Sequence, residues 1–195
     1  MLIDFNYTFR LIALLIFIIL AFYLKKKKSK SFSYIAFFGL FYLYMMLVIN
    51  YTQFPIITDL DPLYHSLSNS VNLVPNNPFT DINRAIILNV LLTIPFGFLL
   101  PFLKSVNFKK IGIYGIVLTL SIESLQLIVY LLLGAHNRFI DINDIFSNFI
   151  GVICGYFLFK IFCGFVISSI NKYNIETNSI LEFICNASKI YVSNK

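Results

Sequence analysis

Five long apolar segments restrict the fold of this chain more than any other feature of its sequence. They cover approximately residues 9–24, 32–49, 85–103, 111–134 and 145–168. A helix needs about 17–25 mainly apolar residues to cross the hydrocarbon core of a membrane. Only 12% of the residues are charged, whereas a soluble domain has about 25%. We therefore predict an all-α, polytopic membrane protein with about five transmembrane helices, and we exclude a soluble enzyme and a disordered chain.

The segments divide the chain into three parts. Residues 1–50 hold two N-terminal transmembrane helices, and residues 51–168 hold an irregular outer loop followed by three transmembrane helices. Residues 169–195 form a predicted cytoplasmic tail. Within this tail an apolar stripe consists of Ile180, Ile184, Ala187 and Tyr191. The stripe is typical of a helix that lies on the membrane surface, and a solvated tail is the alternative.

The distribution of lysine and arginine predicts the orientation of these helices. Placing the basic run of residues 25–30 inside puts all twelve lysines inside and leaves three arginines outside, Arg10, Arg84 and Arg138. An excess of basic residues marks the cytoplasmic side of membrane proteins. We therefore predict a multi-pass protein of the cell membrane with its N-terminus outside and its C-terminus in the cytoplasm.

The net charge of +6 does not indicate a nucleic-acid partner, because no basic helix face or interleaved aromatic motif accompanies it. The three cysteines show neither paired spacing nor metal-ligand spacing. No internal repeat is visible, so the inverted-repeat architecture of many transporters finds no support. The sequence leaves the oligomeric state open.

Glu123 and Gln126 form a polar pair near the middle of the fourth segment. They lie three residues apart and therefore on one helix face. An ionised carboxylate at the centre of a membrane helix costs roughly 2.5–3.5 kcal/mol, so it marks a functional site or a partner on a neighbouring helix. In the third segment Asn89 and Gly97 share a helical arc, and Pro95 and Pro101 free backbone carbonyls. That segment is either a kinked packing helix or a helix that lines a polar site.

A stripe of polar and small residues begins the last segment. It consists of Asp141, Asp144, Asn148, Gly151 and Gly155. Their spacing of three and four residues places them within an arc of roughly 80° on a helix. Helix capping by the carboxylates and close packing of the glycines explain part of the stripe. Capping requires neither Asn148 nor the preceding Arg138, so we predict that the stripe also has a function.

The motifs between residues 72 and 156 occur in a characteristic order. They are NLVP at 72–75, NVLLTIPFGFLLP at 89–101, the pair Glu123 and Gln126, and Arg138 followed by Asp141, Asp144, Asn148, Gly151 and Gly155. In this order they resemble the VanZ-like membrane protein family. The chain departs from the family where Asn76, Asn77 and Pro78 stand between NLVP and Phe79, since family members often have Pro-Phe there directly.

The family takes its name from a protein associated with resistance to teicoplanin, a glycopeptide that acts on cell-wall precursors. The resemblance implies a protein of the cell envelope whose partner is a membrane lipid or a lipid-linked wall precursor. One hypothesis is a membrane enzyme that acts on the head group or phosphate of such a molecule. A second is a non-catalytic protein that binds an amphiphile or limits antibiotic access. A third is a proton or ion pathway.

The enzyme hypothesis assigns roles to eight residues. The candidate catalytic residues are Glu123, Asp141, Asp144 and His136. The candidate substrate-binding residues are Asn89, Gln126, Arg138 and Asn148. The three carboxylates would act as a general base or hold a divalent cation as cofactor. Arg138 would bind phosphate, because its planar fork of donors matches phosphate oxygens.

Overall fold

The computed structural model describes residues 2–57, 71–72, 74, 84–133 and 140–192. Within these residues the helices are α1 (Tyr7–Lys26), α2 (Phe32–Gln53), α4 (Arg84–Leu103), α5 (Phe108–Leu133), α6 (Ile142–Tyr173) and α7 (Ser179–Val192). The first five are long and apolar enough to cross a membrane. The fold is therefore that of an all-α, polytopic membrane protein, as the sequence predicts.

The observed helices extend past the predicted segments at most ends. The fifth segment, predicted over residues 145–168, lies within α6, whose 32 residues correspond to about 48 Å of helix. A hydropathy pattern stops at polar residues, whereas a helix continues until its backbone is capped. The Asp141 side chain caps α6 at its start, and Asn174 ends it in the left-handed conformation with φ of 46°.

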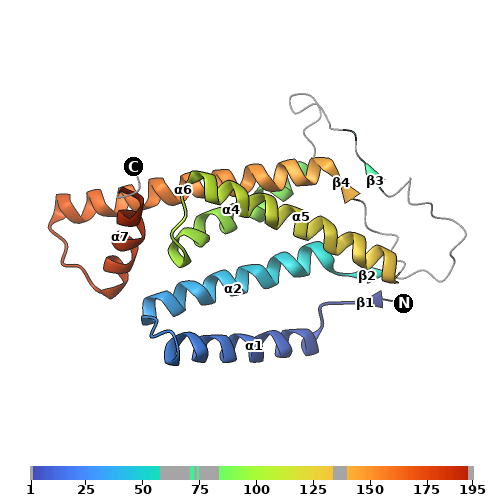
Figure 1. Ribbon diagram of the computed structural model, residues 1–195, viewed down its shortest axis with the longest axis horizontal. Coiled ribbons are helices and arrows are strands. Elements are labelled where there is room, and N and C mark those ends of the chain that lie inside the picture. The colour runs from blue at the N-terminus through green and yellow to red at the C-terminus, as the bar shows by residue number, and fades with distance from the viewer. Residues whose placement is uncertain (1, 58–70, 73, 75–83, 134–139, 193–195) are drawn as a thin grey trace, which may run out of the picture.

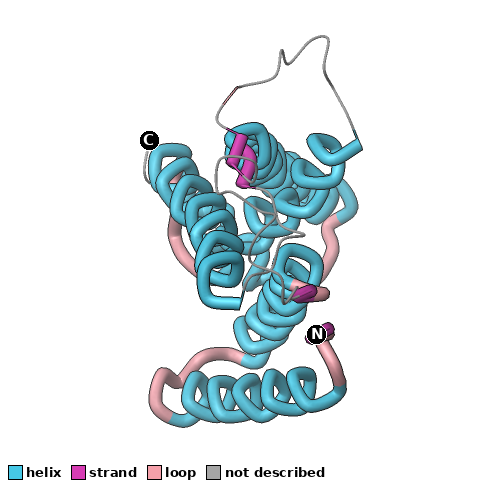
Figure 2. The backbone as a smooth tube through the Cα atoms, turned by 90° about the vertical axis from the view of Figure 1, so that its right-hand side faces the viewer, coloured by secondary structure: helices cyan, strands magenta, loops and turns pink. Residues whose placement is uncertain are grey.

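Helices α2, α4, α5 and α6 run roughly along the long axis of the molecule, and α7 stands across it at one end (Figure 1). Helix α1 packs along α2 and has no buried residue, and it lies at the edge of the molecule when the molecule is viewed from its end (Figure 2). Helix α2 then separates α1 from the group formed by α4, α5 and α6 (Figure 1). The core therefore lies among α2, α4, α5 and α6.

Two short strand pairs lie at one end of the molecule, near the N-terminus (Figure 1). Strand β1 (Leu2–Ile3) pairs antiparallel with β2 (Ile56–Ile57). Strand β3 (Val71–Asn72) pairs in parallel with β4 (Ile140–Asp141), directly before α6. We call the end of the molecule that carries both strand pairs the strand end. The lysine-rich connections from α1 to α2 and from α4 to α5 lie at the opposite end, which we call the lysine end.

Helices α4 and α6 form the most closely packed pair of the fold. A Cβ atom built on Gly97 of α4 would overlap the carbonyl oxygen of Val152 on α6. Conversely, a Cβ atom on Gly155 of α6 would overlap the carbonyl oxygen of Ile94. Glycine lets two helix backbones approach this closely, which is how helices associate in lipid without a hydrophobic driving force. The predicted packing role of these glycines is therefore confirmed.

Pro95 lies beside a contact from α4 to α2. The hydroxyl of Tyr44 donates a hydrogen bond of 2.9 Å to the carbonyl oxygen of Leu92, next to the Leu91 carbonyl that Pro95 leaves without an intrahelical donor. Tyr44 and Phe96 belong to the buried core shared by α2, α4, α5 and α6. One face of this part of α4 is therefore covered by protein, while Leu91 is exposed.

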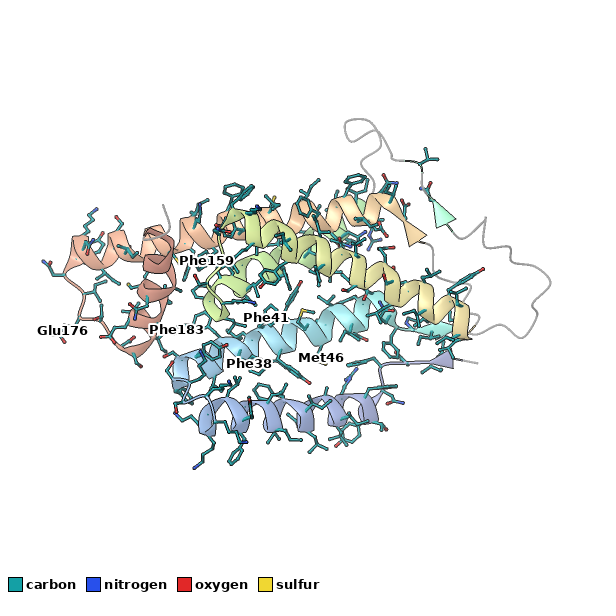
Figure 3. The ribbon with its side chains drawn as sticks, viewed as in Figure 1. Phe38, Phe41, Met46, Phe159, Glu176 and Phe183 are labelled. Carbon is teal, nitrogen blue, oxygen red and sulfur yellow. The ribbon has the colours of Figure 1, made fainter. Side chains whose placement is uncertain are left out.

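The tail forms a helix, α7, and part of its apolar face packs on the protein. In α7, Ile184 is buried in a cluster with Phe159 and Cys163 of α6, and Phe183 packs against the same cluster. Figure 3 shows Phe159 and Phe183 where α6 and α7 meet at the lysine end. Ile184 and Ala187 of the apolar stripe therefore pack within the chain, whereas Ile180 is 49% exposed. That α7 lies on the membrane surface stays a prediction.

Candidate functional site

The strand end holds the start of α6, where Asp141 acts as the N-cap. Its Oδ1 accepts hydrogen bonds from the backbone nitrogen of Asn143 at 2.8 Å and from Asn143 Nδ2 at 2.6 Å. Its Oδ2 accepts a hydrogen bond of 3.1 Å from Nδ2 of Asn72, in the NLVP motif. Asp141 therefore fixes the start of α6 and joins it to β3. Both carboxylate oxygens serve this structural role.

Asp144 lies in the first turn of α6 and meets side chains from two other helices. The Asn89 side chain of α4 hydrogen-bonds the Asp144 carboxylate. The Glu123 carboxylate of α5 interacts electrostatically with Asp144 and Asp141. It also accepts a hydrogen bond from the backbone of Asp141. The structure thus brings together carboxylates that are more than 15 residues apart in the sequence. Like charges this close repel each other, more strongly in the low dielectric of a membrane domain than in water.

Glu123 is buried and incompletely hydrogen-bonded. Only 5% of its surface is exposed, and its Oε2 has no hydrogen-bond partner. Asn148, one turn beyond Asp144 on α6, is 2% exposed, and its Oδ1 has no partner either. A buried polar atom without a partner is rare in folded proteins and calls for an explanation such as a bound molecule.

A second pair of unpaired oxygens lies where α2 meets α5. Gln126 Nε2 donates a hydrogen bond of 3.1 Å to the Thr52 carbonyl, and Gln53 Nε2 donates one of 3.1 Å to the Thr52 hydroxyl. The Oε1 atoms of Gln53 and Gln126 have no partner. Gln126 lies about one turn from Glu123 on α5. We call the whole set the polar site: Gln53, Asn89, Glu123, Gln126, Asp144 and Asn148.

Thr93 supports the polar site from α4. It is fully buried, and its hydroxyl donates a hydrogen bond of 2.7 Å to the Asn148 carbonyl. The neighbouring Gly151 admits this contact, because a Cβ atom there would overlap Thr93 Oγ1. Thr93 and the glycine therefore set the distance between α4 and α6 and, with it, the place of Asn148.

The structure thus brings Asn89, Glu123, Asp141 and Asp144 together, and Gln126 and Asn148 each lie about one turn from a member of this group on the same helix. The other two predicted site residues, His136 and Arg138, lie outside the described residues. Among the residues that are described, no three His, Cys, Asp or Glu side chains lie close enough to hold a metal ion. This finding does not support Glu123, Asp141 and Asp144 as the ligands of a divalent cation.

Sequence reasoning missed the contribution of α2. Thr52 and Gln53 follow the second apolar segment directly, and the polar residues there were expected to begin an irregular loop. In the structure α2 continues to Gln53, which is 7% exposed. The only sequence feature that pointed to α2 was a glutamine near the end of its apolar segment. Such a residue does not show which helix its side chain faces.

We expect Asp141 to matter for stability more than for chemistry. Asp141→Ala removes the cap and the acceptor for Asn72, and should lower the free energy of unfolding by about 1–2 kcal/mol. Asp141→Asn keeps a capping oxygen and loses only the acceptor for Asn72, so it should cost less. Thermal melting of the purified protein, followed by circular dichroism, measures both. A large loss of activity in Asp141→Asn at unchanged melting temperature would contradict this assignment.

A bundle of apolar helices that encloses buried, unpaired carboxylate and amide oxygens defines a polytopic membrane protein with an intramembrane polar site. The VanZ/LLP1 family model matches residues 11–163, from α1 to the second half of α6. The chain therefore belongs to the VanZ/LLP1 family. This match extends the resemblance noted for residues 72–156 to the two N-terminal helices. No curated protein and no solved structure gave a match to the chain.

Proposed function

We propose that this membrane protein belongs to the cell envelope and acts on a lipid head group or a lipid-linked wall precursor in the polar site. The observation that carries the proposal is Glu123, a buried carboxylate with an unpaired oxygen beside a second carboxylate, Asp144. Intramembrane carboxylates are costly and mark functional sites by default.

The depth of the polar site suits a lipid head group. Asp141 marks the start of α6, and Asn148 lies roughly 10.5 Å farther along the helix axis. Glu123 is ten residues, or about 15 Å, from the end of α5 at Leu133. The site therefore begins at the helix ends and reaches into the apolar region, where a head group and the upper part of its chains would meet it.

The two carboxylates offer a means of general acid–base catalysis. Glu123 and Asp144 occupy different surroundings, since Asn89 donates to Asp144 and Glu123 keeps an unpaired oxygen. Paired carboxylates in unlike surroundings can divide the roles of proton acceptor and proton donor. In this proposal one takes the proton from an attacking hydroxyl, and the other returns a proton to the leaving group.

The test is a reaction with defined lipids. Purified protein is incubated with phospholipids or undecaprenyl-linked precursors, with and without Mg²⁺, and products are analysed for loss or exchange of the head group. We expect turnover by the wild type and by Glu176→Gln. Glu176 is an exposed control at the far end of the molecule from the strand end, between α6 and α7 (Figure 3). Glu123→Gln should show no turnover.

A non-catalytic protein that binds an amphiphile, or limits antibiotic access, is the second candidate. The engagement of both Asp141 oxygens favours it, because Oδ1 caps α6 and Oδ2 accepts from Asn72, so one of the three candidate carboxylates is occupied. Binding of lipid that depends on Glu123, without any product, would support this alternative over the enzyme. Survival on a lipoglycopeptide, with and without the gene, tests the link to glycopeptide resistance that the family name suggests.

We also propose that the strand end faces outside and the lysine end faces the cytoplasm. The prediction can be checked in a variant whose three cysteines are replaced. A single cysteine at Asp4 (Asp4→Cys), near β1, should react with an impermeant thiol reagent added to intact cells. A cysteine at Ser105 (Ser105→Cys), in the exposed connection from α4 to α5, should react only after the membrane is opened. The reverse pattern would show the opposite orientation.

A further inference from the structure

The unpaired atoms of the polar site share one chemical property. All four are oxygen acceptors: Gln53 Oε1, Glu123 Oε2, Gln126 Oε1 and Asn148 Oδ1. The amide nitrogens of Gln53 and Gln126 are already occupied, because they donate to Thr52. A molecule that completes this site must therefore bring hydrogen-bond donors.

The charges around the polar site further restrict the class of ligand. The charged side chains that act on Glu123 among the described residues are Asp144 and Asp141, and the one that acts on Asp144 is Asp141. All three are acids. Buried charges without a partner of opposite sign are strongly unfavourable, so a positive charge would relieve both the repulsion and the desolvation. Neutral donors such as hydroxyl groups would satisfy the oxygens and leave the charge uncompensated.

A primary ammonium combines both properties. It is a compact cation with three donors, which suits a site with several separate acceptors better than a planar guanidinium does. At the edge of the apolar region, such a group would arrive on a lipid whose head group carries an amine. The four acceptors belong to three helices, α2, α5 and α6, which are distant in the chain.

We propose that the polar site recognises the primary ammonium of an aminophospholipid head group, through the acceptor oxygens of Glu123, Asn148 and Gln126. This inference rests on the proposed function and specifies its ligand class. The carboxylate of Glu123 provides the charge, and the amide oxygens provide further acceptors. Phosphatidylethanolamine is the simplest lipid with this head group.

A comparison of three lipids with identical acyl chains distinguishes the effect of hydrogen-bond donors from the effect of positive charge. Phosphatidylethanolamine carries both, phosphatidylcholine has a positive charge without N–H donors, and phosphatidylglycerol has hydroxyl donors without a positive charge. The full chain in detergent is mixed with equal amounts of the three, and native mass spectrometry reports which lipid stays bound. We expect phosphatidylethanolamine to be retained about tenfold over each of the others, since hydrogen bonds to charged groups contribute about 1.5–3 kcal/mol.

Variants tie this preference to the polar site. Glu123→Gln should lower retention of phosphatidylethanolamine to that of phosphatidylcholine, and the control Glu176→Gln should keep the wild-type preference. Without lipid, Glu123→Gln should melt at or above the wild-type temperature, because it removes a buried charge beside Asp144. A purely structural glutamate would lower the melting temperature instead. If Glu123→Gln does not fold, Asp144→Asn provides the same comparison.

Two further arms distinguish other sources of positive charge. Free ethanolamine at the concentration of the lipid should not displace phosphatidylethanolamine, and displacement would show that a small soluble amine is the ligand. Mg²⁺ should leave the lipid preference unchanged, and its loss on addition of Mg²⁺ would show a metal site instead.

The failure of this inference differs from that of the proposed function. If phosphatidylcholine or phosphatidylglycerol binds as well and depends equally on Glu123, the ammonium is not recognised, although the site still binds lipid. If no lipid depends on Glu123 for retention, the proposed function fails as well.

Discussion

Gly155→Ala is expected to remove most of the folded protein from the membrane, although it adds a single methyl group. The added Cβ would overlap the carbonyl oxygen of Ile94 and approach the backbone nitrogen of Phe98, neither of which can rotate away. Helices α4 and α6 would have to separate, and the contact between Thr93 and Asn148 would be lost with them. Overpacking a well-packed site typically costs 1–3 kcal/mol, and overlap with backbone atoms places this variant at about 3 kcal/mol or more.

Gly164→Ala is the matched control for this prediction, because it lies on the same helix with nothing within 4 Å of its added Cβ. Alanine favours a helix over glycine by about 1 kcal/mol, so this variant should be as stable as the wild type or slightly more stable. Membrane abundance and thermal melting of the two variants are compared. Gly155→Ala should melt at least about 6 °C below the wild type. Equal melting of both variants would contradict the close contact between α4 and α6.

Asp144→Asn is expected to abolish activity while leaving the protein folded. Asp141, not Asp144, caps α6, so the start of the helix does not depend on the substituted carboxylate. The new asparagine oxygen can still accept the hydrogen bond from Asn89. Without lipid, the melting temperature of this variant should equal or exceed that of the wild type, because one of the clustered negative charges is removed. The loss of charge beside Glu123 removes half of the proposed acid–base pair.

We expect turnover of the lipid substrate to fall by about 100-fold or more, the range in which a general acid or base contributes. Survival on a lipoglycopeptide, normalised to membrane abundance, provides a second readout. The control is Glu176→Gln, which removes a carboxylate at the opposite end of the molecule and should leave turnover unchanged (Figure 3). Wild-type turnover by Asp144→Asn at normal abundance would exclude a charge-dependent role for Asp144.

The sequence by itself determined where the membrane helices lie. A long apolar run has few stable alternatives in lipid, because a helix satisfies its own backbone hydrogen bonds there. Each of the five predicted segments accordingly coincides with a candidate span to within a few residues at most ends. The interpretation of Asp141 as a helix cap is also confirmed, since capping is a local interaction between neighbouring residues.

The glycine pattern indicated close packing but did not identify the partner helix. In the structure Gly151 and Gly155 face α4. Most apolar helix faces look alike in a sequence, and the complementary fit of Gly97 with Val152 appears only when both backbones are placed.

Only the tertiary structure decided how the polar residues divide their roles. The sequence offered Asp141, Asp144 and Glu123 as equivalent carboxylates, yet Asp141 is engaged with Asn72 and Asn143, and Glu123 keeps an unpaired oxygen. It also placed Gln53 in a loop, whereas α2 carries it to the polar site. These differences depend on contacts between residues far apart in the chain, and such contacts are fixed by packing and not by local pattern.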